Sequence, residues 1–321
     1  NTTSITKVGT GTQTFSGTNT YTGGTTLSAG TLVLGNASGA GTGTITQTDG
    51  TSTLRLNTTG TITNDISLFN LESLQSVTLS GAITANNATY DIASGTTTTI
   101  SGDITGGGGT IKEGLGTLVL SGTNTYAGIT NINEGTLLIN GSNAGATEAY
   151  TIGITDGDLA DAATLGGTGS IGGAATLTNT GFLSAGDGGV GTLSFLSSLD
   201  VANASTGSLL FDLGSAGTGD LIDVTGQLNI GNGQLDLDSF AFTNLGATSV
   251  TGTYTWDLFQ VGSFDFTSLG SNTTDNIFGS YSATLAISGG NVVQLTMFVP
   301  EPSSTALLGL GGLMLAFRRK R

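Results

Sequence analysis

Several residue types that common functional sites require are missing or rare in this chain of 321 residues. It has no cysteine and no histidine, so a disulfide framework, a thiolate or imidazole zinc site and a histidine-assisted nucleophile are all excluded. Proline occurs only twice, and charged residues make up 9% of the chain, against about 25% in an ordinary soluble domain. We therefore expect a protein without cofactor or metal that is not an enzyme.

Positive charge is also scarce. The chain has 22 acidic and 7 basic residues, and the last four residues are all basic: Arg318, Arg319, Lys320 and Arg321. The body, residues 1–300, holds only three cations, which are Lys7, Arg55 and Lys112. A surface this acidic repels nucleic acid and anionic membranes, so we expect no nucleic-acid partner.

Glycine and threonine dominate what is present, with 55 and 59 residues. Both are poor helix formers, which argues against a helical bundle. Short stretches alternate instead: in residues 117–120, Leu118 and Leu120 fall on one face, and Thr117 and Val119 fall on the other. Gly, Asn, Asp and Ser punctuate such stretches every 8–12 residues or so. The pattern predicts an all-β protein.

An internal repeat organises the chain. Residues 7–36 align without gaps with residues 112–141 and are identical at 15 of 30 positions. Within each copy a Gly-Thr pair recurs after 19 residues, which favours a parallel β-helix, a solenoid of short stacked strands. Gln13 stands where the second copy has Leu118, and we interpret this break in the inward pattern as the sign of an open first coil.

The segments from Gly9 to Leu32 and from Gly114 to Leu137 resemble the autotransporter-associated β-strand repeat, also called the passenger-associated transport repeat. The resemblance implies an exported, right-handed parallel β-helix without a catalytic residue. We expect the repeats to occupy residues 1–204. Because the first residues already belong to a repeat, we expect this array to be truncated at its N-terminal side.

Residues 205–298 are expected to form the final coils and a cap. Residues 281–298 are predicted to form a hairpin of two strands joined at 288–291, and an antiparallel cap of this kind would cover the edge of the solenoid. Trp256, Phe259, Phe264 and Phe266 are interpreted as the core of this cap rather than as a sugar-stacking platform.

The C-terminal stretch has a different composition. Pro300 and Pro302 flank Glu301, and residues 305–317 follow as an apolar run of 13 residues. As a helix this run would be about 20 Å long, which is short for a bilayer core of about 30 Å. We predict a short C-terminal hydrophobic helix, and the basic residues after it would place the body outside the cytoplasm.

The order of these three parts resembles the PEP-CTERM sorting signal. The resemblance implies that an exosortase-type membrane enzyme recognises Val299, Pro300, Glu301 and Pro302. It also implies that residues 305–317 and the four terminal cations hold the precursor in the inner membrane. Residues 299–321 would then be a cleavable signal for delivery to the surface or extracellular matrix of a Gram-negative bacterium.

Two groups of aspartates are possible sites. Asp156, Asp158 and Asp161 could bind calcium, although a solvated turn is the simpler interpretation. The other cluster is expected to occupy outward positions on strands and consists of Asp220, Asp223, Asp236 and Asp238.

The sequence favours a structural or adhesive surface protein, with exopolysaccharide as one candidate partner. Two alternatives stay open. The Thr-x-Thr triplets are compatible with a glycan- or ice-binding solenoid, and parallel β-helices also include polysaccharide hydrolases and lyases, which cleave with paired carboxylates or a basic residue.

Overall fold

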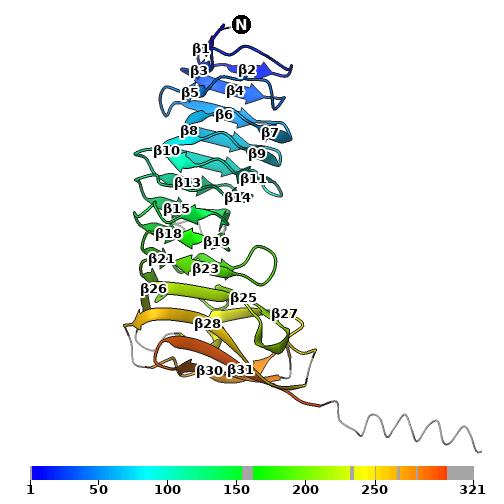
Figure 1. Cartoon of the computed structure of the whole chain (residues 1–321), viewed down its shortest axis with the longest axis vertical. Coiled ribbons are helices and arrows are strands. Elements are labelled where there is room, and N and C mark those ends of the chain that lie inside the picture. The colour runs from blue at the N-terminus through cyan, green and yellow to red at the C-terminus, as the bar shows by residue number, and fades with distance from the viewer. Residues whose placement is uncertain are drawn as a thin grey trace, which may run out of the picture.

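The computed structural model describes residues 2–153, 162–231, 235–249, 251–265, 268–279 and 281–301. It is a β-solenoid of about 9 turns with 54% strand and 2% helix, which confirms the predicted all-β class. Short strands stack on one another from β1 to β27, and the strands β28, β30 and β31 close the far end of the stack (Figure 1). The predicted C-terminal helix lies outside the described residues.

Each full turn contributes strands to three walls, and neighbouring turns pair in parallel. The first wall contains β1 (Ile5–Lys7), β3 (Thr25–Leu27), β5 (Ile45–Gln47), β8 (Ile66–Ser73), β10 (Ile83–Ile92), β12 (Ile104–Thr105), β17 (Ser142–Asn143), β20 (Ser170–Ile171), β23 (Thr192–Phe195) and β26 (Leu221–Asn229). The second wall uses the C-terminal halves of β8, β10 and β26 together with β2 (Thr12–Phe15), β4 (Gly30–Leu34), β6 (Ser52–Leu56), β13 (Thr110–Glu113), β15 (Thr130–Ile132), β18 (Tyr150–Ile152), β21 (Ala175–Leu177) and β24 (Leu199–Asp200).

The third wall is a separate parallel sheet. It contains β7 (Gly60–Ile62), β9 (Val77–Leu79), β11 (Thr97–Ile100), β14 (Thr117–Leu120), β16 (Gly135–Ile139), β19 (Ala163–Gly167), β22 (Gly181–Ala185), β25 (Leu209–Gly214) and β27 (Phe240–Leu245). Two short 3-10 helices, η1 (Ser215–Gly217) and η2 (Leu237–Ser239), connect strands near the end of the stack.

Aligned apolar side chains fill the interior. On the third wall an unbroken column of fully buried leucines runs through five turns and consists of Leu118, Leu137, Leu165, Leu183 and Leu209. Burying each such side chain contributes roughly 1.5–3 kcal/mol. The predicted alternation is confirmed, since Leu118 and Leu120 are buried while Thr117 and Val119 are half-buried.

Hydroxyl side chains align in the same way on the outside. A column on the first wall passes through six turns in register and consists of Thr6, Thr26, Thr46, Ser67, Thr84 and Thr105. All six are exposed or half-buried. The threonine-rich sequence therefore produces a ladder of hydrogen-bonding groups along the stack, because parallel pairing places equivalent positions of successive turns side by side.

The first turn interrupts the inward apolar pattern at Gln13. Gln13 on β2 is exposed and lies in register with Leu32 of β4, and β4 is the one described strand that pairs with β2. The break in the inward pattern at Gln13 thus falls on an exposed strand position.

The far end of the stack is covered by antiparallel strands, as predicted. β30 (Tyr281–Ser288) and β31 (Val292–Val299) form the expected hairpin, and β29 (Thr274–Ile277) pairs with the outer edge of β30. The long strand β28 (Gly252–Phe264) pairs in parallel with β26 and antiparallel with β31. It therefore joins the cap to the last turn of the solenoid.

Candidate functional site

The predicted sorting motif begins where the cap ends. Val299 is the last residue of β31, lies in register with Gly252 of β28 and is 3% exposed. Pro300 and Glu301 follow immediately and are exposed. The motif is thus divided between a strand residue packed in the cap and two accessible residues just beyond it.

The remaining parts of the predicted signal lie outside the described residues. These are Pro302, the apolar run 305–317 and the four basic residues Arg318, Arg319, Lys320 and Arg321. Within the described part of the chain, none of the helices has the length and apolar character needed to span a bilayer.

Trp256 anchors the cap to the solenoid. Its side chain is fully buried, and its indole N–H donates hydrogen bonds to the carbonyl oxygens of Gly214 (3.2 Å) and Thr218 (2.9 Å). Phe259 is also fully buried, and Phe264 packs against the core as a half-buried side chain. The interpretation of these residues as cap core is confirmed, while Phe266 lies outside the described residues.

Lys112 occupies an inward position of the repeat, although it carries charge. Its side chain is fully buried, and its ammonium group donates hydrogen bonds to the carbonyl oxygens of Glu113 (2.8 Å), Gly114 (2.6 Å) and Glu134 (3.2 Å). Burial lowers the pKa of Lys112 to about 8, and the nearby carboxylates of Asp91, Glu134 and Glu113 oppose this shift. Lys112 therefore ties two successive turns together.

Lys7 makes the same contacts in the first repeat copy. Its ammonium group donates to the carbonyl oxygens of Val8 (3.1 Å), Gly9 (2.6 Å) and Ala29 (3.0 Å), each 105 positions before its counterpart around Lys112. We call these two arrangements the lysine clamps. They show that the repeat conserves a three-carbonyl site for an ammonium group.

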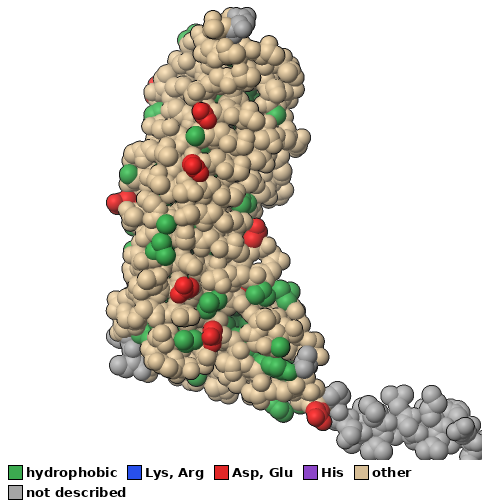
Figure 2. Space-filling model, in the orientation of Figure 1, with side chains coloured by type: hydrophobic (Ala, Val, Ile, Leu, Met, Phe, Trp, Pro, Cys, Tyr) green, Lys and Arg blue, Asp and Glu red, His purple; other side chains and the backbone are tan. Residues whose placement is uncertain are grey.

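The third cation of the body is also engaged. The Arg55 Nε donates to Glu72 Oε2 at 2.8 Å on the outer side of the second wall. Among the described residues, all three cations thus have partners, while most carboxylates lie at the surface. On the face that Figure 2 shows, acidic side chains are spread along the stack and no Lys or Arg is visible.

Asp220 is buried, so the expectation that it points outward is wrong. It is 1% exposed, and its carboxylate accepts hydrogen bonds from the backbone N–H of Gly191 (2.8 Å) and Asp212 (2.7 Å). Burial raises the pKa of Asp220 to about 6, although these two hydrogen bonds act in the opposite direction. The physical reason for the burial is that Asp220 is in phase with the inward residues Ile222 and Val224.

The other three aspartates of that cluster lie in different kinds of element. Asp223 is half-buried on β26, as expected of an outward strand position. Asp236 instead caps η2, because its side chain accepts a hydrogen bond from the backbone N–H of Asp238 (3.2 Å). Asp238 lies within η2, so the expectation that Asp236 and Asp238 lie on strands is wrong. Asp and Ser side chains satisfy free helix N–H groups in this way, which explains the turn.

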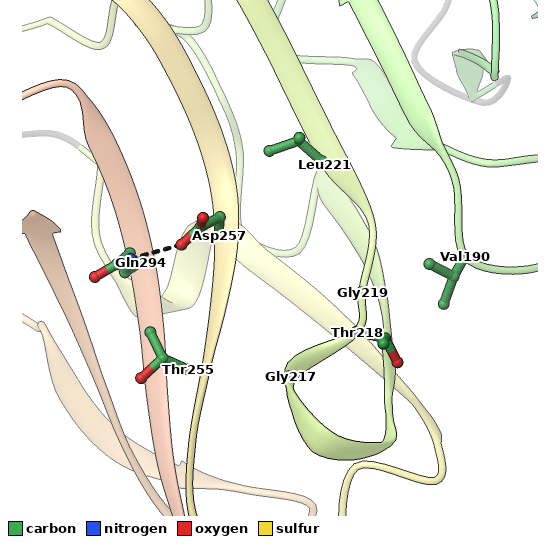
Figure 3. Close-up of a pocket in the computed structure, with 8 residues that line it drawn as sticks. All are labelled: Val190, Gly217, Thr218, Gly219, Leu221, Thr255, Asp257 and Gln294. Carbon is green, nitrogen blue, oxygen red and sulfur yellow. Dashed lines mark hydrogen bonds between the residues drawn. The ribbon is translucent and has the colours of Figure 1, made fainter.

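A shallow trough lies beside the cap, and we call it the cap trough. It has a volume of about 470 Å³. On one side it is lined by Thr255 and Asp257 of β28 and Gln294 of β31, and on the other by Val190, Leu221 and residues 217–219 (Figure 3). The Gln294 Nε2 donates to Asp257 Oδ1 at 2.6 Å, which fixes the two side chains against each other.

The acidic residues that could bind calcium, Asp156, Asp158 and Asp161, lie outside the described residues. In the part of the chain that the structure describes, no group of three or more Asp or Glu side chains is placed to hold a metal ion.

Sequence reasoning missed the lysine clamps, the burial of Asp220 and the cap trough. Two signals were present. A lysine precedes the glycine-rich turn at the same position of both repeat copies, and Asp220 shares the phase of inward residues. The trough left no sequence signal, because it forms between β28, β31 and a loop that precedes β26.

Comparison with known families gives matches to two family models in three segments of the chain. The passenger-associated-transport-repeat model matches residues 5–34 and 111–139, and these matches contain the two lysine clamps. The PEP-CTERM protein-sorting motif model matches residues 298–321. No curated protein and no solved structure matches the chain. The chain is thus a β-solenoid with passenger-associated transport repeats and a PEP-CTERM sorting motif, a combination that indicates export to the cell surface.

Proposed function

We propose that this protein is a structural and adhesive component of the surface or extracellular matrix of a Gram-negative bacterium, and that it has no enzymatic activity. The match to the PEP-CTERM motif over residues 298–321 carries the proposal, because such signals are processed by exosortase, a membrane enzyme. The two matched models describe a repeat and a sorting signal, and neither describes an enzyme.

In the proposed sorting step, exosortase recognises Val299, Pro300, Glu301 and Pro302. Residues 305–317 hold the precursor in the inner membrane, and the four terminal cations remain on its cytoplasmic side. The end of β31 at Val299 supports this role, because the cap is complete before the accessible part of the motif begins. Residues 300–304 span at most about 18 Å when extended, which would keep the cap close to the membrane until processing.

The proposed division of the chain follows from this role. Residues 1–204 form repeats, residues 205–298 form the last turns and the cap, and residues 299–321 form the disposable signal. Removal of residues 299–321 would leave every described strand intact except for Val299, the last residue of β31.

The outer surface supports a structural and adhesive role. The hydroxyl ladder on the first wall offers aligned hydrogen-bonding groups, and the excess of carboxylates keeps an extended β-protein soluble and discourages edge-to-edge association. A hydrated, hydroxyl-rich surface of this kind suits contact with exopolysaccharide.

Localisation of a motif variant tests the proposal. We expect the variant Pro300→Ala/Glu301→Ala to accumulate in the inner-membrane fraction, while the wild type reaches the surface. The control is Asp275→Ala, which removes an exposed carboxylate from β29 of the cap and should reach the surface normally. Surface delivery of the motif variant at wild-type levels would refute the sorting role.

A further inference from the structure

The outer face of the cap carries a row of threonines, and the exposed side chain of Phe298 lies on the same face. Threonines in register form a row across its four strands, namely Thr255, Thr296, Thr284 and Thr274. Three of them are exposed and Thr296 is half-buried. The hydroxyls of Thr255 and Thr296 lie 3.3 Å apart and share a hydrogen bond. Because each hydroxyl both donates and accepts hydrogen bonds, the row can still exchange hydrogen bonds with a hydroxylated ligand.

This row leads directly into the cap trough, because Thr255 belongs to both. The next pair in register is Asp257 and Gln294, and their hydrogen bond of 2.6 Å holds the carboxylate and the amide in fixed relative positions. Asp257 is exposed and Gln294 is half-buried, so their polar ends are accessible from the trough (Figure 3). Such pre-positioned groups lose little conformational entropy when they bind a ligand.

The opposite side of the trough is partly apolar. Val190 is 47% exposed and Leu221 is half-buried, and both line the trough across from Asp257 and Gln294. A ligand in this trough therefore meets hydrogen-bonding groups on one side and apolar groups on the other. Sugar rings combine these properties, because their hydroxyls lie at the edge and their C–H groups on the faces. The volume of about 470 Å³ is also in the range of small-molecule sites.

The negative charge of the trough favours neutral over anionic polysaccharides. The groups that line the trough include the carboxylate of Asp257 and no cation. The cations of the described body, Lys7, Arg55 and Lys112, are engaged by carbonyl groups or by Glu72. A uronate or phosphate group would thus approach a negative site without a counter-charge, which is unfavourable.

From these observations we propose that the cap trough and the adjoining threonine row bind a neutral polysaccharide chain. The Asp257 carboxylate accepts hydrogen bonds from sugar hydroxyls, and the Gln294 amide donates hydrogen bonds to them and accepts hydrogen bonds from them. Val190 and Leu221 contact a ring face, and the threonine row extends the contact along the chain. The inference uses the proposed surface role for its biological setting alone, since binding by the purified protein does not depend on localisation.

The test is binding of the full chain, kept soluble in mild detergent, to immobilised neutral polymers (laminarin, dextran and galactomannan) and to the anionic polymer alginate. We expect at least one immobilised neutral polymer to retain the protein and alginate not to retain it. The variant Asp257→Ala/Gln294→Ala should weaken retention at least tenfold. Its matched control is Asp275→Ala/Asn276→Ala, which removes an exposed carboxylate and an exposed amide from β29 and should bind within twofold of the wild type.

A second variant guards against effects on folding. Thr255→Val keeps the shape of an exposed side chain and removes its hydroxyl, and it should weaken retention severalfold with an unchanged melting temperature. The inference is overturned if none of the neutral polymers retains the wild type, if the wild type binds alginate more tightly than the neutral polymers, or if the trough variant and its control bind equally. None of these results would affect the sorting proposal, which is judged by localisation.

Discussion

The ammonium group of Lys112 donates a 2.6 Å hydrogen bond to the carbonyl oxygen of Gly114, and Lys7 makes the equivalent 2.6 Å bond to Gly9 in the first repeat copy. The copies thus share a buried or half-buried cation in addition to their apolar pattern. In a body with three basic residues, two serve this clamp. The clamp is therefore expected to be a main determinant of the stability of the repeats.

Replacing Lys112 with methionine tests the clamp. Methionine keeps the length and apolar stem of the side chain but leaves three carbonyl oxygens, those of Glu113, Gly114 and Glu134, without this donor. We expect Lys112→Met to lower the free energy of unfolding by at least about 2 kcal/mol in urea titrations of the full chain. Arg55→Gln, which breaks a solvent-accessible ion pair, should cost less than about 1 kcal/mol. Equal effects of the two variants would argue against the clamp.

Gly135 tests the tight bend at which β16 begins, directly after Glu134. Its φ angle is +62°, and a Cβ atom there would collide with the carbonyl oxygens of Gly114 and Gly116. Gly135→Ala should therefore destabilise the protein by more than about 1 kcal/mol, measured as a drop in melting temperature. Gly17→Ala provides the control, because Gly17 has no atom near its added Cβ and does not have a positive φ. A melting temperature of Gly135→Ala equal to that of the control would contradict the described turn.

Asp220 gives a pH-dependent prediction. Burial raises its pKa to about 6 in the folded protein, whereas an unfolded chain has a value near 3.8. Between pH 3.8 and about pH 6 the Asp220 carboxyl is protonated in the folded protein but ionised in the unfolded chain. The tighter proton binding by the folded protein therefore contributes fully to the free energy of unfolding below about pH 4, and this contribution is lost as the pH rises through about 6. The wild type should therefore lose roughly 2 kcal/mol relative to Asp220→Asn, whose side chain does not titrate there, between pH 4 and pH 7. Unfolding curves of the two proteins that shift in parallel across this range would refute the assignment.

Much of the fold was predictable because it follows from period-2 patterning. Leu118 and Leu120 point inward, the 281–298 segment forms a hairpin, and Trp256 is buried in the cap, all as the residues indicated. Asp220 and Lys112 escaped prediction because their burial depends on backbone N–H and carbonyl groups supplied by neighbouring turns. Hydropathy alone assigns charged side chains to solvent.

The candidate sites were predictable to different degrees. Residues that follow one another in the sequence, such as Val299, Pro300 and Glu301, can be recognised as a motif without a structure. The cap trough joins Val190, Asp257 and Gln294 from distant parts of the chain, and it depends on the antiparallel register of β28 with β31. That register is set by packing of the whole cap, which a single sequence does not display.

The central claim is that the protein is displayed outside the cell after its C-terminal signal is removed. Intact-mass spectrometry of the protein recovered from washed cell surfaces measures this directly, with the wild type expressed in its native host. The account predicts a C-terminus at or near the Val299–Pro302 segment, with the apolar run 305–317 and the four terminal basic residues absent. Surface protein with Arg321 still attached, or full-length chain found in the cytosol alone, would contradict it.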